Sequence, residues 1–75
     1  MGYAFSPQTI TVRAGTRVFW MNQDMIDHTV TSDVAGIFDN QLVAGGTTSI
    51  TFTVPGTYNY HCTPHPFMTG TVIVI

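Results

Sequence analysis

Residues 48–62 read TSITFTVPGTYNYHC, and this stretch decides the fold. Apolar and polar residues alternate with a period of two on both sides of Pro55-Gly56, which is the period of a β-strand and not of a helix. Because Pro-Gly favours a tight turn, the stretch predicts two consecutive strands over 48–54 and 57–62. The alternation predicts one set of inward-facing side chains: Ile50, Phe52, Val54, Tyr58, Tyr60 and Cys62.

The same alternation continues outward from this stretch in both directions. Further strands are predicted at residues 9–13, 17–21, 28–31 and 70–75, with a brief one near Phe38. The 17–21 strand is apolar on both faces, which predicts a central position in its sheet. No helical period or internal repeat is visible. We therefore expect one all-β domain over residues 1–75, with six or seven strands in two packed sheets.

The small size of the chain favours a stabilising ligand. A domain of 75 residues hides only about 60% of the surface that its unfolded chain exposes, so its core is marginal. Small domains usually gain stability from disulfides, a metal or a partner. The single cysteine cannot form an internal disulfide. A bound metal is the natural candidate.

The charged residues exclude several classes of partner. There are two arginines, four aspartates and no lysine or glutamate. The two arginines are too few to form a basic stripe for nucleic acid. The sequence also has no apolar run long enough to span a membrane. The aspartates are scattered singly, and we expect them to solvate the surface.

Residues 61–68, HCTPHPFM, carry the chemistry. They place a thiolate (Cys62), an imidazole (His65) and a thioether (Met68) at intervals of three residues, in a short loop between two strands. His28, from another strand, is a fourth candidate donor. Two imidazoles and a thiolate with a weak axial thioether suit a copper ion that cycles between Cu(I) and Cu(II).

Two other interpretations compete with this one. A lone cysteine in a small β domain is usually a buried hydrophobic residue. Zinc also binds Cys and His, although a structural zinc site needs a fourth strong donor, which Met is not. Asp27, beside His28, is the candidate for that donor. The concentration of three metal-competent residues within seven positions favours copper.

The chain resembles the cupredoxin family, most closely its plastocyanin and amicyanin branch. The resemblance rests on the segments AFSP at 4–7, ITVRAGT at 10–16 and YHCTPHPFM at 60–68, and on Asn22 placed six residues before His28. It implies a two-sheet Greek-key β-sandwich. It also implies a type 1 copper site in which both histidines bind through Nδ1, Cys62 through sulfur and Met68 axially.

The resemblance further implies which residues surround the ligands. The backbone N–H of Thr29 is expected to donate to the thiolate. Asn22 is expected either to bond the Thr63 region or to be an ordinary turn residue before its loop. Pro64 has no N–H, so only one such bond to sulfur is expected. The chain departs from the family by lacking the usual first strand and by having Asp27 before His28.

The resemblance implies that the chain is a small electron-transfer protein and not an enzyme. It would shuttle single electrons between larger redox proteins in the periplasm or another extracytoplasmic space, with its targeting or anchoring segment outside this chain. A copper store or delivery protein, and a domain of a larger copper oxidase or reductase, are the alternatives. We expect a monomer, with pairing of copies possible through the edge left by the missing strand.

The family's electron exit is the edge of the second histidine, within an apolar patch. Here Pro66 and Phe67 flank His65, with Met25 and Ile26 as the expected opposite wall. The predicted complex is transient and rests on apolar contact. His61, beside Cys62, is a second possible exit, although an ordinary exposed strand residue is the simpler interpretation.

Overall fold

A computed structural model describes residues 4–75 of the chain, which contain seven strands. Residues 1–3, the start of the predicted domain, lie outside the described residues. Within residues 4–75 there is no helix that is long and apolar enough to cross a membrane. The strands are β1 (Thr9–Val12), β2 (Thr16–Met21), β3 (His28–Ser32), β4 (Asp39–Leu42), β5 (Thr47–Phe52), β6 (Gly56–His61) and β7 (Thr69–Val74).

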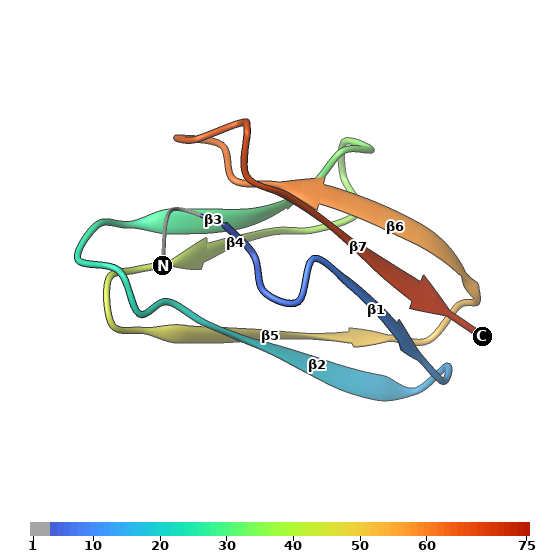
Figure 1. Cartoon of the computed structure of the whole chain (residues 1–75). Coiled ribbons are helices and arrows are strands. Elements are labelled where there is room, and N and C mark those ends of the chain that lie inside the picture. Colours follow the sequence, from blue (N-terminus) through green and yellow to red (C-terminus); the bar gives the residue numbers. More distant parts are fainter. Residues whose placement is uncertain (1–3) are drawn as a thin grey trace.

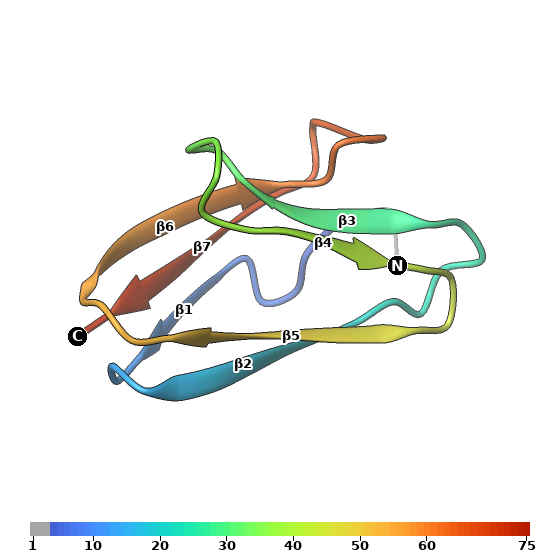
Figure 2. The ribbon, with the colours of Figure 1, turned by 180° about the vertical axis from the view of Figure 1, so that it is seen from behind.

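The strands form two facing layers (Figure 1). The larger sheet has the order β1-β7-β6-β3-β4, and the smaller one consists of β2 and β5. β1 runs parallel to β7, while the other pairs are antiparallel. Figure 2 shows the same two layers from behind. The predicted all-β sandwich of two sheets is therefore confirmed.

The core lies between the two layers and is centred on Trp20 and Tyr60. Trp20 of β2 is 8% exposed and Tyr60 of β6 is 3% exposed. The indole Nε1–H of Trp20 donates to the Tyr60 hydroxyl across 3.2 Å, and the rings meet edge to face at 5.6 Å. Burial raises the pKa of Tyr60 above its ordinary value, and the bond from Trp20 offsets part of this effect. The phenol is therefore neutral at physiological pH and joins the two sheets.

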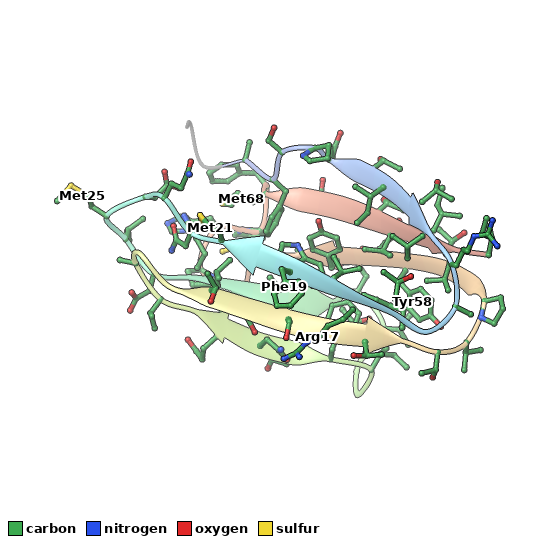
Figure 3. The ribbon with its side chains drawn as sticks, turned by 90° about the horizontal axis from the view of Figure 1, so that it is seen from below. Arg17, Phe19, Met21, Met25, Tyr58 and Met68 are labelled. Atoms are coloured by element: carbon green, nitrogen blue, oxygen red, sulfur yellow. The ribbon has the colours of Figure 1, made fainter. Side chains whose placement is uncertain are left out.

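The prediction that residues 17–21 form a central strand is wrong. Within residues 4–75, β2 pairs only with β5. Phe19 and Met21 are 67% and 65% exposed, and Figure 3 shows them with Arg17 on the outer face of β2. The Arg17 guanidinium lies 5.1 Å from the centre of the Phe19 ring, so its stem and charge cover part of that ring.

Val54 is a second departure from the predicted alternation. It was expected to face inward but is 63% exposed. β5 ends at Phe52, two residues before Val54, and the chain turns into Pro55. Alternation holds only while the backbone stays extended, so it does not apply to a residue in the turn. The carbonyl of Val54 accepts a hydrogen bond from the Tyr58 hydroxyl, which secures the turn.

Candidate metal centre

Sheet pairing brings the two segments with metal-binding side chains together. His28 is the first residue of β3, and Cys62 directly follows β6. These strands are antiparallel neighbours, with Thr31 opposite His61. The start of β3 therefore lies near the end of β6, although 34 residues separate His28 from Cys62.

The loop between β6 and β7 is closed by three backbone hydrogen bonds. The His65 N–H donates to the Cys62 carbonyl (3.2 Å), and the Met68 N–H donates to the His65 carbonyl (2.9 Å). The Cys62 N–H donates back to the Met68 carbonyl (3.0 Å). Pro64 and Pro66 fix their own φ angles and restrict the residues before them, which suits consecutive turns. The loop thus brings Cys62, His65 and Met68 close together at the end of β6.

Three potential ligand atoms converge there. The Nδ1 atoms of His28 and His65 are 3.2 Å apart, and the Cys62 Sγ lies 3.5 Å and 3.7 Å from them. A point equidistant from the corners of this triangle lies about 2.0 Å from each, close to the usual metal–nitrogen and metal–sulfur bond lengths. The donor set therefore fits one transition-metal ion. A trigonal group of two imidazoles and one thiolate is the equatorial set that copper of the blue type uses.

The centre is shielded from solvent except at His65. Cys62 is 0% exposed, His28 2% and Met68 4%, whereas His65 is partly exposed. Met68 also lines an open cavity beside His28. The role of Met68 as an axial ligand stays a prediction. The imidazole of His65 is the part of the centre that meets the surface.

Thr29, and not Asn22, joins the two ligand segments. The Thr29 hydroxyl accepts a hydrogen bond from the Thr63 N–H across 2.8 Å. The Asn22 amide instead donates to the carbonyls of Ile26 and Leu42, at 2.8 Å and 2.9 Å. The expected bond from Asn22 to the Thr63 region is therefore replaced by contacts within the loop between β2 and β3 and to β4. The bond expected from the Thr29 N–H to the thiolate stays a prediction.

The aspartates do more than solvate the surface, which corrects the sequence interpretation. The carboxylate of Asp24 lies 2.8 Å from the Nε2 of His28, and that of Asp27 accepts the N–H of Ala44 at 2.9 Å. Asp33 lies 2.6 Å from the Nδ1 of His61, and Asp39 accepts from the Thr31 hydroxyl. The backbone N–H of Ala44 thus holds one oxygen of Asp27, the candidate fourth zinc donor. Asp24 was missed as a site residue because a single carboxylate has no distinguishing sequence pattern beyond its four-residue spacing from the histidine.

The residues expected to form the docking patch are exposed. Met25 is 99% exposed, Ile26 40% and Phe67 70%, and Pro66 is exposed as well. Figure 3 shows Met25 at the tip of the loop between β2 and β3, pointing away from the molecule. The Phe67 ring lies 6.1 Å from the imidazole of His65. The Phe67 ring thus lies beside the partly exposed imidazole of His65.

His61 is only partly exposed and does not project freely into solvent. Its side chain is 30% exposed and is tied to Asp33 at the end of β3. The prediction that it points away from the core is compatible with this position. The contact with Asp33 fixes the orientation of the imidazole on the outer face of β6.

Comparison with known proteins agrees with the geometry of the centre. The family model described as copper binding proteins, plastocyanin/azurin family, matches residues 1–75. Amicyanin from Paracoccus denitrificans is 44% identical over 69 residues, which cover 84% of this chain and 52% of the relative. The chain thus spans about half the length of this curated relative.

Solved structures show the same architecture. A purple cupredoxin from Nitrosopumilus maritimus superimposes with a TM-score of 0.90 at 29% identity, over 96% of this chain and 82% of the other. A mutant of amicyanin in the Cu(I) state gives a TM-score of 0.91 at 34% identity, over 100% of this chain and 76% of the other. The similarity therefore extends over the whole sandwich and includes the ligand loop.

Proposed function

Because the chain belongs to the plastocyanin/azurin family of copper-binding proteins, we propose that it is a one-electron carrier. Copper is its cofactor, and the electron would be held on this ion between two docking events. The observation that carries the proposal is the triangle of two imidazole Nδ1 atoms and one buried cysteine Sγ. That donor set serves both Cu(I) and Cu(II).

We propose that His28, Cys62 and His65 would hold the copper ion as its principal ligands, and that Met68 would be a weaker fourth ligand. Each residue is held by the fold before a metal arrives: His28 by β3, and the other three by the hydrogen-bonded loop. A centre that keeps one geometry in both oxidation states needs little rearrangement when an electron moves. The residues of the chain thus act by fixing geometry and excluding water.

The same assignment argues for transfer to partners and against catalysis. Four protein ligands leave no open position at which a substrate could bind the ion. The chain would be an electron carrier in the periplasm or another extracytoplasmic space, acting as a monomer. A Cu(I) store, the alternative, would be expected to offer more sulfur donors than one cysteine and one axial methionine.

Voltammetry of the copper-loaded protein tests this function. We expect a reversible one-electron wave, with the metal retained in both oxidation states. Met68→Leu should raise the potential because loss of a weak donor favours Cu(I), and Met68→Gln should lower it because a harder donor favours Cu(II). Release of the metal on oxidation would indicate a Cu(I) store. Unchanged potentials in both variants would remove Met68 from the ligand set.

We further propose that redox partners dock on the patch formed by Met25, Ile26, Pro66 and Phe67. These exposed apolar side chains lie on the two loops that carry the ligands, and His65 is the ligand with access to solvent. No charged residue lies between Cys62 and Ile75. Long-range electrostatic steering should therefore be weak, and apolar contact should hold a short-lived complex.

A lysine in this patch should slow electron transfer without changing the copper centre. Phe67→Lys and Met25→Lys each place a charge where the partner must displace water, so we expect the second-order rate to fall about tenfold, which corresponds to about 1.4 kcal/mol. Stopped-flow mixing with a redox protein at low and moderate salt measures this rate. Val34→Lys, on the loop between β3 and β4, is the matched control because Val34 is also exposed (65%). A steep salt dependence, or full rates in both patch variants, would place docking elsewhere, with His61 next to be tested.

A further inference from the structure

The imidazole of His28 is held from both sides, and the side away from the metal centre contacts a carboxylate. Its Nδ1 faces the Cys62 Sγ, while its Nε2 lies 2.8 Å from the Oδ2 of Asp24. His28 is 2% exposed, and the side chain of Asp24 is 12% exposed. This contact is thus largely removed from water, where electrostatic interactions are stronger than at an open surface.

The loop between β2 and β3 is built to hold this carboxylate in place. The Asn22 side chain is 3% exposed and uses its amide group on three backbone partners. Its oxygen accepts from the Asp24 N–H at 2.9 Å, and its nitrogen donates to the carbonyls of Ile26 and Leu42. Asn22 therefore anchors the loop to β4 and fixes the backbone of Asp24 at the distance that the His28 contact needs.

We propose that Asp24 is a positioning residue that sets both the tautomer of His28 and the reduction potential of the copper centre. The inference rests on the proposed function, since it concerns the same centre. A carboxylate on Nε2 keeps the proton on that nitrogen, which leaves the Nδ1 lone pair directed at the metal. In the metal-free protein this makes His28 Nδ1 an acceptor, and the 3.2 Å contact with His65 Nδ1 then has His65 as its donor.

The sign of the effect on the potential follows from charge. A negative group near the ion stabilises Cu(II) more than Cu(I), because Cu(II) carries the greater positive charge. It also makes the imidazole a stronger donor, which acts in the same direction. Asp24 therefore lowers the reduction potential, and removal of its charge should raise it.

Asp24→Asn tests the charge, and Asp27→Asn is the matched control. Both variants remove one carboxylate from the same loop, but Asp27 contacts the Ala44 N–H and not the imidazole. Loss of an outer carboxylate partner commonly changes metal affinity by about tenfold or more. We expect Asp24→Asn to reduce the preference for Cu(II) over Cu(I) about tenfold, which is about 59 mV for a one-electron couple. Asp27→Asn should shift the potential by less than a third of that.

Metal-free protein supplies a test that does not depend on copper. Nitrogen-15 NMR of the imidazoles at about pH 8 should show His28 as the Nε2–H tautomer in the wild type. Asp24→Leu, which cannot accept that proton, should give a mixture of tautomers. A wild-type His28 protonated on Nδ1, or equal potentials in Asp24→Asn and Asp27→Asn, would overturn the proposal. If the proposal for Asp24 fails but the copper-loaded protein still gives a reversible voltammetric wave, the electron-carrier function stands. If His28 has the expected tautomer but the copper-loaded protein gives no wave, the electron-carrier function is refuted and the role of Asp24 in the tautomer stands.

Discussion

Cys62→Ser should abolish the intense blue absorption of the Cu(II)-loaded protein completely. That absorption arises from charge transfer between a thiolate and Cu(II), and a serine hydroxyl at neutral pH is neither anionic nor a soft donor. The Cys62 Sγ is the one thiolate available, since the chain has a single cysteine, which is free and buried. Absorption spectroscopy after addition of Cu(II) gives the result directly.

The sandwich itself should survive this substitution. The main-chain hydrogen bonds that close the loop run between Cys62, His65 and Met68 and do not use the thiol. Circular dichroism should therefore show the same β content in the variant. His61→Ala, the adjacent position on β6, should keep the blue colour because its imidazole contacts Asp33 and not the centre. Persistence of the colour in Cys62→Ser would refute the ligand assignment, and its loss in His61→Ala would mean that any disturbance of the strand end destroys the site.

The ligand loop was predictable because its information is local. Cys62, His65 and Met68 lie within seven residues, so loop closure alone brings them together, and the two prolines narrow the conformations that the loop can adopt. His28 could be named only as a candidate fourth donor, because its place beside Cys62 depends on the pairing of β3 with β6. The strands were predictable for the same reason, because the alternation of apolar and polar residues is also a local pattern.

The errors concern features that depend on long-range packing. Alternation shows which side chains share a face of β2, but not whether another layer covers that face, so residues 17–21 were predicted to form a central strand although Phe19 is 67% exposed. The role of Asp24 depends on how Asn22 closes its loop and on where β4 supplies a carbonyl. The tie between ligand segments was assigned to Asn22 for the same reason, whereas Thr29 on β3 makes it.

Copper should increase the free energy of unfolding of the protein by a large fraction of its total value. A ligand that binds only the native state contributes RT ln(1 + [L]/Kd), which is about 4 kcal/mol at a free concentration a thousandfold above Kd. In a domain of this size, each kcal/mol shifts the melting temperature by about 4–8 °C. We therefore expect a shift of roughly 15–30 °C between the metal-free and copper-loaded protein.

The structure explains why the metal has so much to contribute. The core contains few large side chains, with Trp20, Phe52 and Tyr60 as its buried aromatic residues among those described. A metal bound by His28 and Cys62 would join segments that are 34 residues apart, as a disulfide does in other small domains. Thermal unfolding followed by circular dichroism, with and without copper under reducing conditions, measures the shift. Cys62→Ser is the control and should lose most of it, and equal melting of the metal-free and loaded wild type would show that the sandwich does not depend on its metal.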